Sequence, residues 1–322
     1  MLTIYEMGAA GLNPRQVPDS CAQAIWIDLI NPTKEEDKDI ERMVGVQVPT
    51  REEMAEIEVS SRLYNENGAH YMTANILYAV DSPEPQGTAV TFILADKQLI
   101  TVRYAEPRAF GLFLSRARKG DMACDTPVAI MLGLLEAIID READLIERLQ
   151  LETEKLAQNI FEMKGGQPTA AKRYDVVLRQ IGRVGEINAR ARESLLSLGR
   201  VITYLSQVVV LRGDVESIRQ RLRTEDRDVQ SLTDHVQYLS TRINFMLDAS
   251  LGMVTIEQNQ IIKLFSVAAV MLMPPTLIAS IYGMNFRHMP ELEWLYGYPY
   301  AIGLMVVSAL VFYIYFKRKG WL

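Results

Sequence analysis

Two uncharged runs close to the C-terminus constrain the fold more than any other feature of the sequence. They are Leu264–Tyr282 and Tyr298–Phe316, each long enough for a helix to cross the hydrocarbon core of a bilayer. Lys263 precedes the first run, and Lys317-Arg318-Lys319 follow the second. By the positive-inside rule both basic flanks face the cytoplasm, which places the linker 283–297 outside. The sequence therefore predicts an integral membrane protein with two spans.

The remainder of the chain has the character of a cytoplasmic protein. The formal net charge is -6 over 322 residues, and nearly all the acidic residues precede the first span. No basic stripe with interleaved aromatic residues stands out, which argues against a nucleic-acid partner, and the excess acid attracts cations. Met1–Asp19 lacks a basic start followed by an apolar run, so we expect both termini in the cytoplasm. No nucleophile–base pair, phosphate loop or metal cluster points to an enzyme.

Residues 1–125 mix short apolar runs with turn residues and predict an α+β domain. Strands are expected over Ala24–Ile30 and Tyr71–Val80. Thr88–Leu94 and Gln98–Arg103 flank a short polar turn and predict a hairpin. Between the first two strands, Pro49–Arg62 carries glutamates at helix-like spacing.

From about Pro127 onward the apolar residues recur at helical spacing. The pattern is interrupted at Gly165-Gly166-Gln167-Pro168 and again at Arg212-Gly213-Asp214. No proline follows the second interruption until Pro274. The sequence therefore predicts one helix of about 70 residues that runs into the first span. We therefore divide the chain into an α/β domain (1–125), a long helical hairpin packed on it (126–212), a stalk helix (213–263), a first span (264–282), an outer loop (283–297), a second span (298–316) and a basic tail (317–322).

The first span has the features expected of a pore lining, although two spans cannot enclose a pore without an oligomer. One face of the helix is predicted to line the pore. Its residues are Asn259, Ile262, Phe265, Ala269, Met273, Thr276 and Ser280. Neither span contains an acid or a base, whereas proton-coupled carriers usually need one. Neutral oxygens suit passive flow of a cation that keeps its water, and magnesium gives up its water reluctantly. Close packing between helices by small residues is the alternative interpretation.

Three short motifs around the spans identify a family. The first span ends with Tyr282-Gly283-Met284-Asn285-Phe286, and the linker continues with Met289-Pro290-Glu291-Leu292. The second span closes with Tyr315-Phe316-Lys317-Arg318-Lys319. Together they resemble the CorA family of magnesium transporters, with Gly-Met-Asn as the family signature. The resemblance is strong from about Ile256 to Leu322 and looser over the remainder.

The resemblance implies a funnel-shaped homopentamer in the inner membrane that conducts magnesium, with cobalt and nickel as surrogates. Gly283, Met284 and Asn285 would form the selectivity filter. Met273 would be a hydrophobic constriction, Thr276 a polar contact and Asn259 part of the inner entrance. The loop acids Glu291 and Glu293 would concentrate cations outside, or would simply be solvated loop charges.

Intracellular magnesium closes the channel in this family by binding between cytoplasmic domains. The resemblance therefore implies regulatory carboxylates, for which the stalk offers Asp226, Asp228 and Asp234. The α/β domain offers Asp81, Glu84 or Asp96. Two other interpretations stay open: a zinc-transporting relative of the same superfamily, and a membrane-anchored sensor or scaffold that conducts nothing.

Overall fold

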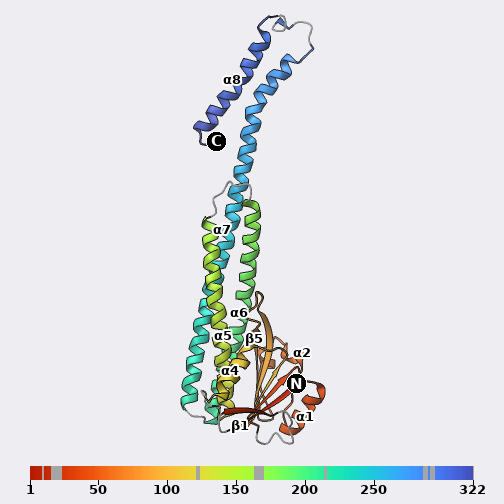
Figure 1. Cartoon of the computed structure of the whole chain (residues 1–322), viewed down its shortest axis with the longest axis vertical. Helices are drawn as coiled ribbons and strands as arrows, with labels where there is room; N and C mark the ends of the chain where they lie inside the picture. Colours follow the sequence, from red (N-terminus) through yellow and green to blue (C-terminus); the bar gives the residue numbers. More distant parts are fainter. Residues whose placement is uncertain are drawn as a thin grey trace. The chain divides into compact units, whose positions relative to one another are not determined.

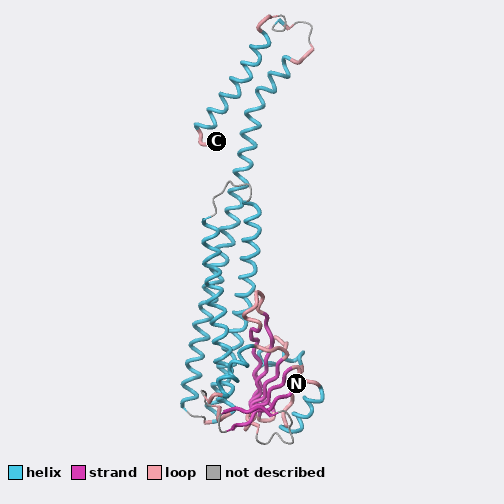
Figure 2. The backbone as a smooth tube through the Cα atoms, in the orientation of Figure 1, coloured by secondary structure: helices cyan, strands magenta, loops and turns pink. Residues whose placement is uncertain are grey.

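The computed structural model describes residues 1–8, 11–15, 24–120, 124–162, 170–213, 216–285, 289–290 and 294–321. The chain forms two compact units. The first combines Met1–Asn159 with Arg179–Met246, and the second combines Ile160–Leu178 with Leu247–Leu322. Strands occur only in the first unit of the described chain (Figure 2).

A seven-stranded sheet forms the centre of the first unit. Its strands are β1 (Leu2–Gly8), β2 (Gly11–Arg15), β3 (Trp26–Ile30), β4 (Leu63–Glu66), β5 (Ala69–Tyr78), β6 (Gln86–Leu94) and β7 (Leu99–Arg103). The spatial order is β2-β1-β3-β7-β6-β5-β4. Only the pair β3 and β7 is parallel among these described strands. The predicted hairpin is confirmed as β6 and β7, and the predicted strands before it as β3 and β5.

The described part of the chain also contains eight helices (Figure 1). They are α1 (Lys34–Val44), α2 (Arg51–Met54), α3 (Val59–Arg62), α4 (Arg108–Arg118), α5 (Pro127–Glu162), α6 (Ala170–Arg212), α7 (Glu216–Tyr282) and α8 (Gly297–Arg318).

Alternation along the central strands directs side chains to two different layers. Ile27 and Ile100 belong to an apolar cluster that also contains Ile40 of α1. On the other face, Trp26 packs edge-on against Phe113 of α4, with ring centroids 5.7 Å apart. The strands are therefore buried on both faces, as expected for the centre of a mixed sheet.

The helical expectation for Pro49–Arg62 is only partly correct. Two four-residue helices, α2 and α3, replace one longer helix. Thr50 and Glu53 form a capping box that begins α2, and Met54 is its buried residue. Ile57 is 87% exposed, so no continuous apolar stripe is available to stabilise a longer helix.

A buried ion pair joins the two parallel strands. Arg103 donates to both carboxylate oxygens of Asp28, from Nε at 3.1 Å and from Nη2 at 2.8 Å. The guanidinium also lies 4.4 Å from the centre of the Phe110 ring. Thr101 donates to Asp28 at 2.7 Å, so the buried carboxylate is fully supplied with donors.

The sheet meets α6 where β4 ends. β4 pairs with β5 only as far as Met72, which leaves the backbone of Asn75 without a strand beside it. Serines of α6 take that place: Asn75 N–H donates to Ser197 Oγ at 2.9 Å, and Ser194 Oγ donates to Asn75 O at 2.8 Å. Side-chain hydroxyls thus satisfy an edge that would otherwise hold unpaired backbone groups.

Glu142 of α5 lies behind this junction and is fully buried. Its Oε1 is in hydrogen-bond contact with Ser194 Oγ. Ser194 Oγ lies within donating distance of both Asn75 O and Glu142 Oε1, and Ser197 Oγ is a second donor to Asn75 O at 2.9 Å. Burial raises the pKa of Glu142 to about 8, consistent with a neutral carboxyl group.

Three helices of the described chain are long and apolar enough to cross a membrane, namely α7, α8 and the segment Tyr174–Arg212 of α6. Half of the apolar window in α6 is buried, because α6 packs inside the first unit. The windows in α7 and α8 are only 6% and 11% buried. The chain is thus a membrane protein whose spans lie at the C-terminal end of α7 and in α8, as the two uncharged runs predicted.

Replacing Arg103 with methionine should destabilise the protein by about 3–5 kcal/mol, because it leaves the Asp28 carboxylate buried without its cation. Denaturant unfolding of the detergent-solubilised chain measures this loss. The double variant Asp28→Asn/Arg103→Met keeps an acceptor for Thr101 and should lose clearly less. A double variant as unstable as Arg103→Met alone would contradict this account of the ion pair.

Glu142 should make stability depend on pH. Its folded pKa of about 8 exceeds the ordinary value of 4.5, so the stabilisation is complete below pH 4.5 and is lost as the pH rises through 8. Thermal unfolding between pH 5 and pH 9 should show this fall. Glu142→Gln should flatten the curve, and a curve that stays as steep would exclude Glu142 as its origin.

Candidate functional site

One face of α7 is covered by α8 within the second unit. Val267 is 2% exposed, and the half-buried residues Met271, Pro274 and Ile278 follow it at spacings of three or four. Lys263 lies on the same side, where its Nζ donates to Gly320 O at 3.2 Å. The covered face of α7 is therefore the one that contacts α8.

The predicted pore face lies on the opposite side of the helix. Thr276 is nine residues from Val267, about two and a half turns at 3.6 residues per turn, so the two point in opposite directions. Every residue predicted to line the pore is exposed in the single chain. These residues are Asn259, Ile262, Phe265, Ala269, Met273, Thr276 and Ser280. The structure leaves this face free for a partner.

A pair of prolines interrupts hydrogen bonding within the span but does not end the helix. Pro274 and Pro275 have no N–H to donate to the carbonyls one turn earlier, yet α7 continues to Tyr282. Thr276 Oγ1 donates to Leu272 O at 2.8 Å. Because its proton is engaged there, the Thr276 oxygen can offer only lone pairs, which suits water bound to a cation.

The Gly-Met-Asn triplet directly follows the end of α7. Gly283 N donates to Ala279 O at 2.9 Å, and Met284 N donates to Ile281 O at 3.2 Å, so the chain completes a last turn. A β-carbon at Gly283 would lie 3.1 Å from Ala279 O, closer than most side chains approach a carbonyl. Gly283, Met284 and Asn285 are all exposed. The predicted loop acids Glu291 and Glu293 lie outside the described residues.

Comparison with known proteins shows the family of the chain. The sequence profile of the family described as CorA-like Mg²⁺ transporter protein matches residues 22–318. The chain belongs to that family.

Two relatives match over their full length. "Magnesium transport protein CorA" of Salmonella typhimurium is 36% identical over 327 residues, and the protein of the same description from Escherichia coli K12 is 34% identical over 325 residues. In both cases the match covers 100% of each chain. The CorA-like family is one of transporters, so the chain is not an enzyme.

A solved structure shows the same fold. The complete structure of the CorA magnesium transporter from Methanocaldococcus jannaschii aligns with a TM-score of 0.74 at 19% identity. The alignment covers 100% of this chain and 99% of that one. The expected combination of an α/β domain, long helices and C-terminal membrane helices is thereby confirmed.

In this CorA-like chain the predicted pore face belongs to a longer pattern along α7. Exposed residues recur every seven positions in two parallel series. They are Tyr238, Phe245, Gly252, Asn259, Ser266, Met273 and Ser280, and Thr241, Asp248, Thr255, Ile262, Ala269, Thr276 and Gly283. A seven-residue repeat is typical of parallel helices that pack on one another. Asp248, fourteen positions before Ile262, lies on this pattern and was not among the residues predicted from the sequence.

The predicted regulatory acids Asp226, Asp228 and Asp234 are exposed on α7 and do not meet as a cluster. Within the residues that the structure describes, no group of three or more His, Cys, Asp or Glu side chains could hold a metal ion. Asp226 lines a groove of about 480 Å³ between α6 and α7.

Asp228 lies in an acidic environment. The pKa of Glu225 is raised to about 7, first by burial and then by the negative charges of Glu136, Asp228 and Asp140. Arg221 offsets part of this charge and pairs with Glu136 at 2.7 Å. A cation bound near Asp228 would relieve the remaining repulsion.

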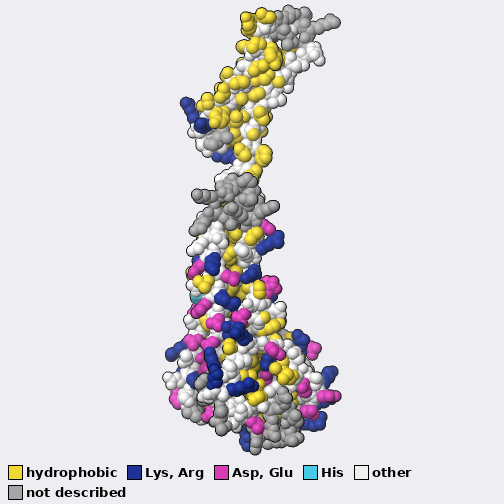
Figure 3. All heavy atoms as spheres, in the orientation of Figure 1, with side chains coloured by type: hydrophobic (Ala, Val, Ile, Leu, Met, Phe, Trp, Pro, Cys, Tyr) yellow, Lys and Arg dark blue, Asp and Glu magenta, His cyan; other side chains and the backbone are white. Residues whose placement is uncertain are grey.

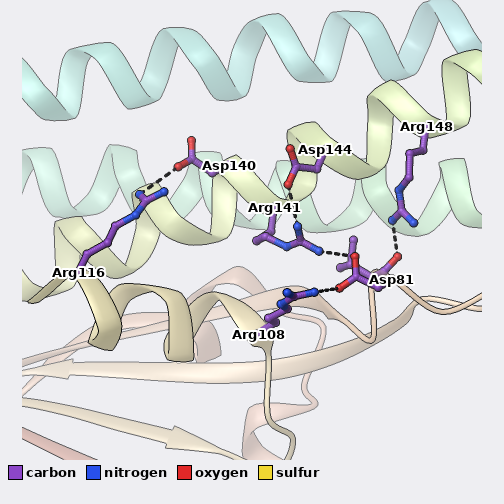
Figure 4. A network of polar contacts seen from close by, with 8 residues as sticks. Asp81, Arg108, Arg116, Asp140, Arg141, Asp144 and Arg148 are labelled. Atoms are coloured by element: carbon purple, nitrogen blue, oxygen red, sulfur yellow. Dashed lines mark hydrogen bonds and ion pairs between the residues drawn. The ribbon is translucent and has the colours of Figure 1, made fainter. Parts of the chain in front are cut away.

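Asp81 is less suited to binding a metal than the sequence suggested. Its carboxylate pairs with Arg108 Nη1 at 2.6 Å and with Arg141 Nη2 at 2.7 Å (Figure 4). The two guanidinium groups hold the pKa of Asp81 below its ordinary value. A divalent cation would have to displace both arginines. The other candidates of the α/β domain, Glu84 and Asp96, are exposed.

Proposed function

We propose that this chain is a subunit of a channel-like transporter for passive magnesium influx across the inner membrane. The observation that carries the proposal is the Gly283-Met284-Asn285 triplet at the end of a continuous spanning helix in a CorA-like protein. Full-length relatives described as magnesium transport proteins support it. The amino and carboxyl termini face the cytoplasm, in keeping with the basic flanks of both spans.

The conducting unit is a homopentamer embedded in the bilayer. Two spans cannot surround a pore, and the seven-residue repeat along α7 supports parallel packing between copies of the chain. The aromatic residues Tyr238 and Phe245 lie on that repeat and are 55% and 59% exposed in the single chain, which leaves apolar surface for a neighbouring copy. The pentamer number rests on the family resemblance.

Each subunit is divided into seven functional segments. They are 1–125, 126–212, 213–263, 264–282, 283–297, 298–316 and 317–322.

The pore binds the hydrated ion weakly through neutral oxygens. The Asn285 amide and the Gly283 carbonyl contact the waters of the ion at the outer mouth, where Glu291 and Glu293 concentrate cations. Met273 forms the apolar constriction, and Asn259 lines the inner entrance. The membrane potential supplies about 2.3 kcal/mol per charge at 100 mV, and twice that for a divalent ion. Cobalt and nickel ions are the expected surrogates for magnesium.

Intracellular magnesium regulates the pore by bridging cytoplasmic domains of adjacent subunits. Asp226, Asp228 and Asp234 supply carboxylates on α7. The bound metal cancels repulsion between the acids, and its loss lets the subunits separate. The exposure of the three acids and the acidic surroundings of Asp228 support this assignment.

Replacing Asn285 with alanine should abolish most magnesium uptake into proteoliposomes, because the filter loses its amide. Leu295→Ala is the matched control, since Leu295 is an exposed side chain of the same linker outside the triplet. Equal flux through wild type and Asn285→Ala would refute the filter assignment. A wild type without flux would favour the sensor, and one that carries zinc in preference to magnesium would favour the zinc-transporting relative.

The charge reversals Asp226→Lys and Asp228→Lys should each weaken inhibition by internal magnesium and shift the inhibition curve to higher concentration. Glu35→Lys in α1 is the control, because it makes the same change of charge at an exposed site away from α7. The measurement is magnesium flux at stepwise internal magnesium concentrations. Unchanged curves for both α7 variants would remove these two acids from the regulatory site.

A further inference from the structure

The end of α8 and the base of the span in α7 bring four cations together within the second unit. Lys317, Arg318 and Lys319 are exposed at the C-terminal end of α8. Lys263 joins them through its hydrogen bond to Gly320 O and lies 5.4 Å from the centre of the Trp321 ring. Figure 3 shows Lys and Arg side chains gathered at one end of the apolar surface of this unit.

These cations have no carboxylate partner among the residues that the structure describes. Among the described residues, no ion pair joins Lys263, Lys317, Arg318 or Lys319 to a carboxylate. In the described part of 247–322, the only acidic residues are Asp248 and Glu257. The first unit behaves differently, since many of its arginines pair with acids. Four like charges held together favour an anionic partner from outside the chain.

Aromatic side chains mark the depth at which these cations lie. Lys317 Nζ is 5.8 Å from the Tyr313 ring, and Lys319 Nζ is 5.3 Å from the Tyr315 ring. Trp321 stacks on Phe316, with ring centroids 5.6 Å apart. Tyrosine and tryptophan are enriched at the level of lipid headgroups. The cations therefore face the layer in which lipid phosphates are found.

We propose that this C-terminal cation cluster, Lys263, Lys317, Arg318 and Lys319, binds the phosphate of anionic phospholipids in the cytoplasmic leaflet. Basic residues immediately cytoplasmic of a span attract anionic headgroups and act over about a Debye length. Lys263 of α7 contacts Gly320, which follows α8, so both helices contribute residues to the same site. The proposal requires membrane insertion but not ion conduction, so the two can fail separately.

The test uses the full chain in vesicles that contain brominated lipid, which quenches nearby tryptophan. In a Trp294→Phe background, Trp321 is the remaining tryptophan near the lipid, because Trp26 is fully buried in the sheet. Brominated phosphatidylglycerol should quench Trp321 several-fold more effectively than the same mole fraction of brominated phosphatidylcholine. Added sodium chloride should reduce the difference in the unmodified cluster, since salt screens the attraction.

Variants separate this site from any lipid preference that arises from the other basic residues of the chain. The triple variant Lys317→Gln/Arg318→Gln/Lys319→Gln should quench equally with both lipids. The control variant Lys34→Gln/Lys38→Gln/Lys97→Gln removes the same charge from exposed positions of the first unit. This control should keep the stronger quenching by phosphatidylglycerol. If the first triple variant fails to insert, the single variants Lys317→Gln and Lys319→Gln should each show a partial loss. Equal quenching by both lipids in wild type, or a preference that survives the triple and single variants, overturns the proposal. Loss of the preference on addition of inorganic phosphate would identify a general anion site instead and would also overturn it.

Discussion

The need to pair backbone groups inside the bilayer is the constraint on which the rest of this molecule depends. A helix meets that need within one segment, and α7 stays helical to Tyr282 despite Pro274 and Pro275. Because the helix continues, its faces can be distinguished: one meets α8, and the opposite one carries the proposed pore residues. The triplet after Tyr282 takes its position from the same helix.

In the first unit, side chains form hydrogen bonds with backbone groups that no neighbouring strand pairs. At Asn75 the sheet runs beyond β4, and hydroxyl groups of α6 replace the missing strand. Behind them lies the buried Glu142, whose pKa burial raises to about 8. Inside the sheet, Asp28 and Arg103 are buried together, so that each charge lies against its opposite. The first unit is thus held by polar contacts as well as by its apolar layers.

The features predicted well from sequence are those that depend on local pattern. Uncharged runs and basic flanks predicted the spans, and two runs on either side of a short polar turn predicted the hairpin β6–β7. Pro49–Arg62 was misjudged because glutamates at helical spacing do not supply an apolar face. The bonds of Asn75 with Ser194 and Ser197 could not be predicted, since they join residues more than 100 positions apart.

The continuity of α7 also limits which changes of length the chain can tolerate. Removing one residue from a helix rotates everything beyond it by about 100° relative to what precedes it. A deletion between Tyr238 and Ser280 would therefore turn the proposed pore face above the cut toward a different neighbour, while leaving the composition of the span almost unchanged. Substitutions can be absorbed one side chain at a time, whereas insertions and deletions here would break the alignment between the stalk and the outer mouth.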